Sequence, residues 1–351
     1  MASRYSFAPR PDLMLLGIAL TRHCNLRCPH CIRDDVTEVQ SLPLSLITRV
    51  VDEARDLFGQ VVCSFTGGEP TIHPEWNGIV DLMKGRGLTY KFVTNGWHMR
   101  GIMPSIDRHP PGAVRVSLSG GDEPVHDEER GRGSFRRVQL AVALLTSRQI
   151  PTGLSIVIDR RDRHQVRLAA DLAEDLGCNW ISYILPQPVP GSAGRNSDLA
   201  PEEWRPVKDE VEALSREPHR RTFISMDYGS PFDGAEVVCD TMELKRIYID
   251  PDGHVSLCCQ LADYGFNRKD VVGNLYTTSL ADVYDQYLHA MKDLRAATIP
   301  GARSPLTKLD AYPCMRCARA QGKLDWLKQF PDTPWAAAMH EPADDCVAQL
   351  A

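Results

Sequence analysis

Apolar residues follow two alternating periods along roughly the first half of the chain. Short apolar runs typical of buried strands lie at residues 13–20, 61–68, 89–96, 113–120, 152–159 and 179–187. Stretches with apolar residues at helical spacing lie between them, at 43–59, 75–87, 134–149 and 164–177. This alternation predicts an α/β fold in which six parallel strands, covered outside by helices, curl into a partial (β/α)6 TIM-like barrel.

The segments that directly follow the predicted strands contain polar and glycine residues. In a parallel sheet of this kind, the loops after the strand carboxyl ends build the active site. Three cysteines follow the first strand, and the segments 66–70, 94–96 and 117–120 follow or close the next three. We therefore expect all four segments to converge on one rim of the barrel.

The alternation stops after a Pro/Gly/Ser-rich segment at 185–201 and a helical stretch at 201–217. A β-hairpin is predicted at 246–259, because strand-like residues flank the turn sequence Asp-Pro-Asp-Gly at 250–253. We expect three parts: a barrel at 1–221 with a long loop at 186–201, a small α+β domain at 222–330, and a C-terminal tail at 331–351.

Composition narrows the classes of protein. Hydrophobic residues make up 43% and charged residues 25%, as in a globular protein with a sizeable core. The formal net charge of −6 gives no basic footprint, so we expect no nucleic-acid partner. The longest early apolar run is eight residues, too short to cross a bilayer, and the N-terminus resembles no signal peptide. We expect a cytoplasmic protein without a membrane partner.

The chain contains eleven cysteines. In a reducing compartment a disulfide framework is improbable, so clustered cysteines indicate metal binding. Seven of the cysteines fall in two clusters, and Cys259 adjoins the second, whereas Cys63, Cys178 and Cys346 are isolated.

Cys24, Cys28 and Cys31 form the first cluster, with the spacing C-x3-C-x2-C. One interpretation is a zinc site with a distant fourth ligand. The other is a [4Fe–4S] cluster held by one short loop, with the usual fourth thiolate absent. The position of Cys24 directly after a buried strand favours the cluster.

This cysteine loop resembles the signature of radical S-adenosylmethionine (SAM) enzymes, in which an aromatic residue precedes the last cysteine; here that residue is His30. The resemblance implies that SAM chelates the fourth iron through its amino and carboxylate groups. Reductive cleavage of SAM would then give a 5′-deoxyadenosyl radical, which abstracts a hydrogen atom from a substrate carbon.

The segment TGGEP resembles the family's GGE motif, which implies that Gly67, Gly68 and Glu69 hold the amino group of SAM. The physical logic is that glycines let the backbone approach the ligand, while a carboxylate pairs with an ammonium. Taken alone, the sequence Gly-Gly-Glu-Pro would be interpreted as an ordinary turn.

The next strand ends resemble further SAM contacts of the family. Asn95, Ser117 and Ser119 would meet the ribose or the carboxylate, although many relatives have Asp where this chain has Ser119. Arg130, in a stretch resembling HD-x-x-R-G-x-G-S/T-F, would bind the SAM carboxylate, or alternatively form a solvated salt bridge at a helix start. Backbone around Leu185 would meet adenine.

A second cluster consists of Cys239, Cys258, Cys314 and Cys317. Four thiolates make a closed site, for zinc or a fully ligated iron–sulfur cluster. The spacing resembles the SPASM and twitch extensions of radical SAM enzymes. SPASM relatives have a further cysteine where this chain has Lys323. That departure favours the twitch arrangement with one auxiliary [4Fe–4S] cluster.

Cys259 is adjacent to the expected ligand Cys258. Some radical SAM epimerases use such a thiol to return a hydrogen atom to the substrate radical, so Cys259 is a candidate hydrogen donor. The alternative is a small core residue.

The resemblance implies an oxidoreductase or epimerase with two [4Fe–4S] clusters, SAM and an external one-electron reductant of the flavodoxin or ferredoxin type. We expect a small natural-product metabolite as substrate, such as a sugar, an aminoglycoside or a nucleoside-like compound. The alternative substrate is a ribosomal precursor peptide. A non-enzymatic metal-binding module is a third class, and TGGEP after a strand argues against it.

Overall fold

A computed structural model of the chain describes residues 11, 13–32, 40–190, 193, 198–226, 239–262, 264–298 and 307–342. Its strands form one sheet of ten, in the order β10-β9-β8-β1-β2-β3-β4-β5-β6-β7. The strands are β1 (Met14–Thr21), β2 (Val61–Gly67), β3 (Tyr90–Thr94), β4 (Ala113–Leu118), β5 (Thr152–Val157), β6 (Trp180–Ile184), β7 (Phe223–Met226), β8 (Arg246–Ile249), β9 (His254–Ser256) and β10 (Val271–Asn274). Strands β8 and β1 to β7 run parallel to one another, whereas the pairs β8–β9 and β9–β10 are antiparallel.

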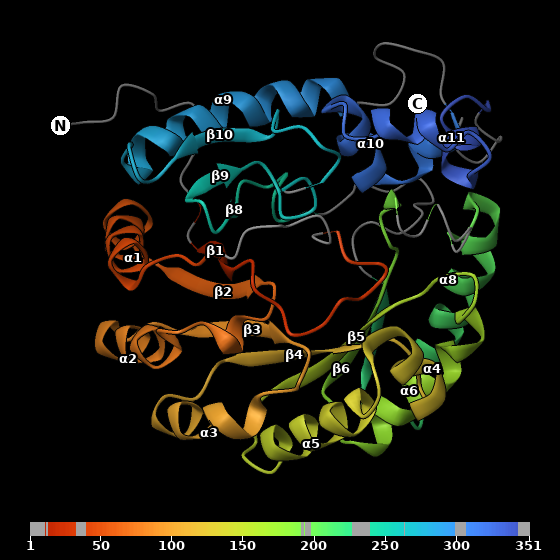
Figure 1. The fold of residues 1–351 in the computed structure, drawn as a ribbon, viewed down its shortest axis with the longest axis horizontal. Helices are drawn as coiled ribbons and strands as arrows, with labels where there is room; N and C mark the ends of the chain where they lie inside the picture. The colour runs from red at the N-terminus through yellow and green to blue at the C-terminus, as the bar shows by residue number, and fades with distance from the viewer. Residues whose placement is uncertain are drawn as a thin grey trace.

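Helices surround the outside of the curved sheet (Figure 1). They are α1 (Leu44–Phe58), α2 (Trp76–Arg86), α3 (Met99–Arg108), α4 (Glu123–Arg130), α5 (Ser134–Thr146), α6 (Val166–Asp175) and α8 (Pro201–Ser215). The C-terminal part adds α9 (Leu280–Thr298), α10 (Pro313–Ala320) and α11 (Pro334–Ala338), and short 3-10 turns lie at Pro70–Ile72, Arg163–Gln165, Lys308–Ala311 and Asp325–Gln329. The expected partial α/β barrel with a small α+β region is therefore confirmed.

The main core lies between the outer face of the sheet and the helices. In β3 the residues Tyr90, Phe92 and Thr94 are buried, while the residues between them are half-buried. Trp76 of α2 contacts Phe92 edge-to-face, with ring centroids 5.2 Å apart. Alternate strand residues therefore pack beneath the helices, and the others face the barrel interior.

Several elements were not indicated by the sequence pattern. Helix α3 contains Gly101 and Pro104, two residues that disfavour helix interiors, and it is held by core residues such as Ile106. Strands β7 and β10 are four residues each, too short for a clear period. Helix α9 has 19 residues, and its apolar residues pack in the core.

One contact crosses each of the two expected domain boundaries, after residue 221 and after residue 330. Strand β7 continues the barrel sheet, because Trp180 of β6 pairs with Phe223. Trp335 of α11 is buried against Tyr312, with ring centroids 5.0 Å apart. The domain limits at 221 and 330 remain predictions.

The C-terminal hairpin joins the barrel through β1. Residues Leu15 to Ile18 of β1 pair in parallel with Arg246 to Ile249 of β8. Beyond the strand ends, Arg22 lies 2.5 Å from Asp252 and 3.6 Å from the buried Asp250. The turn expected at 250–253 therefore contacts the loop that leads to Cys24.

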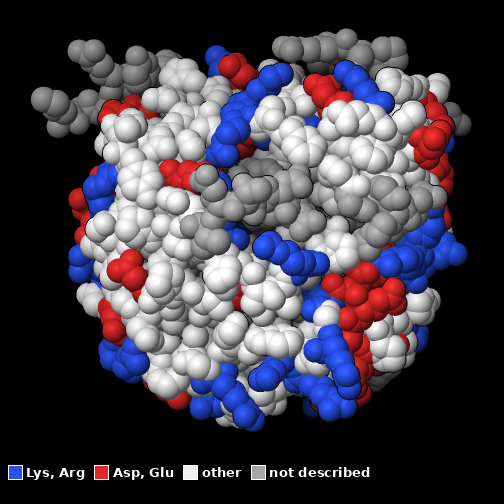
Figure 2. All heavy atoms as spheres, in the orientation of Figure 1, with Lys and Arg blue, Asp and Glu red and all other residues white. Residues whose placement is uncertain are grey.

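Charged side chains of both signs lie over the face seen in Figure 2, with lysine and arginine most evident along its lower edge. Among the described residues, no helix has both the length and the apolar character needed to cross a membrane.

Lys323 is a buried cation that forms an ion pair within the C-terminal part of the fold. Its side chain is fully buried, its ammonium lies 2.5 Å from Oδ1 of the equally buried Asp270, and it donates to the carbonyl of Asn267. The residue that departs from the expected cysteine pattern thus stabilises the local fold through an ion pair.

We expect Lys323→Met to lower the free energy of unfolding by about 3–5 kcal/mol, because Asp270 would be left buried without its cation. Thermal or urea unfolding of the reconstituted protein measures this. The double variant with Asp270→Leu should recover most of the loss, whereas Lys328→Met, at an exposed lysine, should change little. An unchanged unfolding midpoint in the single variant would contradict the structural role.

Candidate active site and cluster sites

The three clustered cysteines lie in the loop after β1, at its carboxyl end. Cys31 donates its backbone N–H to the carbonyl of Cys28 at 3.0 Å, and Leu26 N–H donates to Sγ of Cys24 at 3.4 Å. Burial raises the pKa of the Cys24 thiol to about 11, and the nearby Cys28 and Cys31 add to this rise. Three half-buried sulfurs are therefore gathered in one place, where bound iron would stabilise their thiolate forms.

The glycines of TGGEP hold the cysteine loop by close backbone contact. Gly68 donates its N–H to the carbonyl of Thr21, and Glu69 donates to the carbonyl of His23. A Cβ on Gly68 would lie 2.1 Å from the carbonyl oxygen of His23, and Gly67 has φ of +127°. Both glycines are thus required by packing against residues 21–23, a reason separate from the close ligand approach that the motif implied.

Glu69 is buried at the junction of β2 and β3. Its Oε1 accepts hydrogen bonds from both the N–H and the hydroxyl of Thr71 and from the hydroxyl of Thr94. Its Oε2 accepts the backbone N–H of Asn95 at 2.7 Å. Burial raises the pKa of this carboxyl, although the hydrogen bonds oppose the rise. Because each carboxylate oxygen has two lone pairs, Oε2 retains capacity to accept from a ligand ammonium.

Asn95 links the third strand end to the cysteine loop. Its amide nitrogen donates to Oδ1 of Asn25 at 2.9 Å, and its own Oδ1 accepts the N–H of Trp97. The structure therefore places Asn95 beside both Glu69 and the loop between Cys24 and Cys28.

Ser119 and Arg130 meet at the fourth strand end. Arg130 is in the last turn of α4 and donates from Nε to the hydroxyl of Ser119 at 2.6 Å, so it does not lie at a helix start. Ser119 N–H donates to Nδ1 of the buried His126, whose pKa burial lowers to about 3. Ser117 lies two residues earlier on β4, half-buried on the inner face of the sheet.

His30 is tied to residues that the sequence did not single out. Its Nδ1 lies 3.4 Å from Oε2 of Glu129, which also pairs with Arg161 after β5. Burial opposes ionisation of Glu129, but hydrogen bonds with His30 and Arg161 lower its pKa to about 2. Glu129 thus anchors the cysteine loop to α4; its place in HDEER, within the motif of Arg130, was the one available signal.

Leu185 follows β6 and is 8% exposed. Together with Gln187 it lines a small cavity that also contacts Cys314 and Gln260. The β6 end of the rim therefore reaches the second cysteine cluster.

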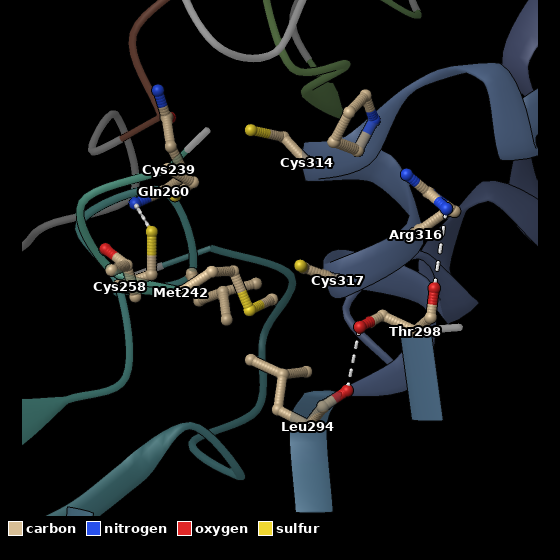
Figure 3. A pocket seen from close by; sticks show the side chains of 12 residues that line it. Cys239, Met242, Cys258, Gln260, Leu294, Thr298, Cys314, Arg316 and Cys317 are labelled. Carbon is tan, nitrogen blue, oxygen red and sulfur yellow. Dashed lines mark hydrogen bonds between the residues drawn. The ribbon is translucent and has the colours of Figure 1, made fainter. Parts of the chain in front are cut away.

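The second cluster lines one cavity of about 130 Å³, shown in Figure 3. Cys314 and Cys317 are one turn apart on α10, so both sulfurs lie on the same helix face. Cys258 follows the β8–β9 hairpin, and Cys239 precedes β8. Burial raises the pKa of the Cys317 thiol to about 12, and Cys239 adds to the rise. Four sulfurs from three segments thus enclose one space.

The spread of the sulfurs argues against a single zinc ion. Four thiolates bound to one zinc at about 2.3 Å lie about 3.8 Å apart. Among the described residues, the one group of three or more potential ligands with all donor atoms within 4.8 Å is Asp250, Asp252 and His254. Neither cysteine cluster is that compact, which fits a multi-iron cluster. The Asp250 group is instead paired with Arg22 and Arg268.

Cys259 is not among the residues that line the cavity of Cys258, but its thiol is hydrogen-bonded to the neighbouring Cys258 thiol, and this contact raises the pKa of Cys258. Cys259 packs against Ala19 of β1 and Tyr248 of β8, and its Sγ is 4.0 Å from an Nη of Arg246. Since Ala19 and Tyr248 are on the inner face of the sheet, Cys259 faces the barrel side. Cys63 and Cys178 are buried, and Cys346 lies outside the described residues.

Two family models match the chain. The model of the radical SAM superfamily matches residues 18–173, and that of an iron-sulfur cluster-binding domain, SPASM, matches residues 239–319. The two matches contain the first and second cysteine clusters respectively.

Individual relatives are more distant. The chain is 25% identical to the antilisterial bacteriocin subtilosin biosynthesis protein AlbA of Bacillus subtilis, over 77% of this chain and 59% of the relative. It is 24% identical to the Fe-coproporphyrin III synthase of Methanosarcina barkeri, over 85% of this chain and 79% of that protein. The chain thus spans less than two thirds of the length of AlbA.

The fold resembles the crystal structure of Streptococcus suis SuiB bound to S-adenosylmethionine. The TM-score is 0.70 at 14% identity, covering 95% of this chain and 77% of SuiB. SuiB has also been crystallised with its precursor peptide SuiA, and that structure has a TM-score of 0.68.

The family matches and the fold agree with the gathered cysteines and the strand-end motifs. The chain is therefore an enzyme of the radical SAM superfamily with a C-terminal SPASM iron–sulfur domain, and its cofactors are S-adenosylmethionine and two [4Fe–4S] clusters.

Proposed function

We propose that this enzyme modifies a peptide, such as a ribosomal precursor peptide, at an unactivated carbon. The observation that carries the proposal is the likeness over 95% of the chain to SuiB, which binds the precursor peptide SuiA. The similarity to AlbA, a bacteriocin biosynthesis protein, supports the same substrate class. The peptide was the alternative in the sequence interpretation, and it now replaces the small metabolite as the preferred substrate.

We assign the SAM cluster to Cys24, Cys28 and Cys31, because three thiolates leave one iron for SAM. When bound, this cluster and SAM supply a 5′-deoxyadenosyl radical for hydrogen abstraction. We assign the SAM ammonium to Glu69, whose carboxylate accepts hydrogen bonds from Thr71 and Thr94.

The remaining SAM contacts come from the next strand ends. Arg130, oriented by Ser119, offers its guanidinium to the SAM carboxylate. Asn95 and Ser117 offer an amide and a hydroxyl to the ribose, and His30 and backbone at Leu185 complete the assignment. Each of these groups projects from a segment that the sheet fixes.

We assign the auxiliary cluster to Cys239, Cys258, Cys314 and Cys317. Four protein thiolates leave no iron free for substrate, so this group would serve electron transfer. An external flavodoxin or ferredoxin would supply the electron for SAM cleavage.

A small metabolite is the second candidate substrate. The similarity to Fe-coproporphyrin III synthase favours it, because that relative is named for a porphyrin product. Epimerisation, oxidation and cross-linking are all compatible with hydrogen abstraction as the first step.

Variants of the two cysteine clusters should have different effects on SAM cleavage. We expect Cys24→Ala and Cys314→Ala each to lower the iron content of the reconstituted protein from about eight to about four per chain. Only Cys24→Ala should abolish 5′-deoxyadenosine formation from SAM under reducing conditions, because it removes a ligand of the cluster that binds SAM. Iron analysis and chromatography measure both, and wild-type protein that forms no 5′-deoxyadenosine would overturn the assignment.

The substrate class is tested by incubating the reconstituted enzyme with SAM, a chemical reductant and a synthetic peptide. The peptide has the sequence of a short reading frame next to the gene of the enzyme. We expect the peptide to lose hydrogen mass or to incorporate solvent deuterium, as read by mass spectrometry. Coproporphyrin and sugar substrates tested in parallel should remain unchanged; turnover of one of these, with no change in the peptide, would favour the second candidate.

Cys259 is proposed as the hydrogen donor if the reaction is an epimerisation: its thiol would give a hydrogen atom to the substrate carbon radical, and the resulting thiyl radical would return to the thiol by taking one electron from the external reductant and one proton from solvent. In deuterated water, wild-type product should then carry deuterium at the epimerised carbon, because a thiol exchanges with solvent. Cys259→Ala should form 5′-deoxyadenosine without epimerised product, while Cys178→Ala, at a buried cysteine in the core, should retain product formation. Epimerised product from Cys259→Ala would exclude this role.

A further inference from the structure

Basic side chains lie on the inner face of the sheet, below the rim that carries the cysteines. Lys91 of β3 lies between Tyr90 and Phe92, both buried in the helix-covered core. Arg115 of β4 is likewise flanked by buried valines. Because side chains alternate along a strand, Lys91 and Arg115 face the barrel interior, where both are half-buried.

The pairing of β3 with β4 makes these two cations neighbours, and a third cation is on β8. Lys91 pairs with Ala113, so Arg115, two residues further on the same face, is its diagonal neighbour. Arg246 of β8 faces the same interior. Burial lowers the pKa of Lys91, and the charges of Arg246 and Arg115 lower it further. Lys91 and Arg115 are therefore neighbours on the inner face, and Arg246 is near enough for its charge to act on Lys91.

Among the described residues, one acid is near this group of cations. Asp240 is the acid near Lys91, and it already pairs with Arg246 at 3.0 Å. Within the described parts of the chain, the side chains of Lys91 and Arg115 have neither a hydrogen bond nor an ion pair. Among these four described side chains, three cations and one anion leave a local net charge of +2. Partly desolvated cations without partners favour binding of an anion.

Aromatic rings flank the cluster. Arg115 pairs with Gly153, and a Cβ on Gly153 would lie 2.0 Å from the ring of Trp180. The indole of Trp180 therefore lies across Gly153, next to Arg115. On the other side, the ring of Tyr248 lies over Gly17. Apolar walls lower the local dielectric, which strengthens attraction between the cations and a bound anion.

The cluster lies at a depth suited to a substrate. Lys91 is three residues before Thr94, which contacts Glu69 at the rim, so it lies about 10 Å below the rim at about 3.3 Å per residue. A substrate whose charged group is anchored there would extend toward the rim, and its far end would lie close to the residues proposed to bind SAM.

We propose that Lys91 and Arg115 bind a carboxylate of the substrate. If the substrate is a peptide, as proposed above, this carboxylate is an Asp or Glu side chain or the C-terminus of the peptide. Arg115 offers a planar fork that matches a carboxylate, and Lys91 adds a point charge.

The test uses anaerobically reconstituted enzyme with SAM and three probes. N-acetylglutamate α-amide carries a side-chain carboxylate, N-acetylalanine carries a C-terminal carboxylate, and N-acetylglutamine α-amide is the uncharged control. Calorimetry measures their dissociation constants. We expect at least one charged probe to bind more tightly than the uncharged control, and the tighter of the two identifies the source of the carboxylate.

Lys91→Gln and Arg115→Gln should each weaken binding of that probe about tenfold or more, while Lys292→Gln and Arg100→Gln, at exposed positions, should not. Equal binding of charged and uncharged probes, or equal effects in all four variants, would overturn the proposal. An equal loss of SAM affinity in Lys91→Gln and Arg115→Gln would assign the pair to the SAM carboxylate and would also overturn it.

The outcome is distinguishable from failure of the proposed function. If no peptide is modified but carboxylate binding still depends on Lys91 and Arg115, the site stands and the peptide proposal fails. If a peptide is modified at unchanged rate and affinity by both variants, the function stands and the carboxylate site is wrong.

Discussion

The parallel pairing of β8 with β1 is the contact on which both cluster sites depend. Strand β1 ends just before the loop of Cys24, and β8 opens the hairpin that leads to Cys258. Four paired residues on each strand fix the two segments in one sheet. The buried ion pair of Arg22 with Asp250 then holds the hairpin turn against the cysteine loop. One sheet thus positions the first and the second cysteine clusters relative to each other.

The rim of the barrel shows how a motif can serve fold and ligand at once. Gly67 and Gly68 are required because the backbone crosses residues 21–23 without room for a Cβ. Their packing turns Glu69 into the interior, where threonine hydroxyls and a backbone N–H orient its carboxylate. A carboxylate that is already oriented can receive an ammonium with little reorganisation, so this packing would also prepare the SAM contact proposed for Glu69.

Charge divides the barrel interior into two levels. At the rim, Glu69 supplies a buried carboxylate close to the cysteine loop. Below it, Lys91 and Arg115 supply positive charge without protein partners among the described residues. A substrate with one carboxylate and a reactive carbon about 10 Å away is complementary to this arrangement, because its charge fixes which atoms reach the rim.

The sequence alone determined the six barrel strands and the two groups of clustered cysteines, because period and spacing are local properties. It also indicated Glu69 and Asn95, which follow strands directly. Only the tertiary structure decided that β8 joins β1, that Lys323 pairs with buried Asp270, and that Lys91 meets cations from other strands. Those features depend on contacts between residues far apart in the chain, and no local pattern encodes which strands become neighbours or which charges meet.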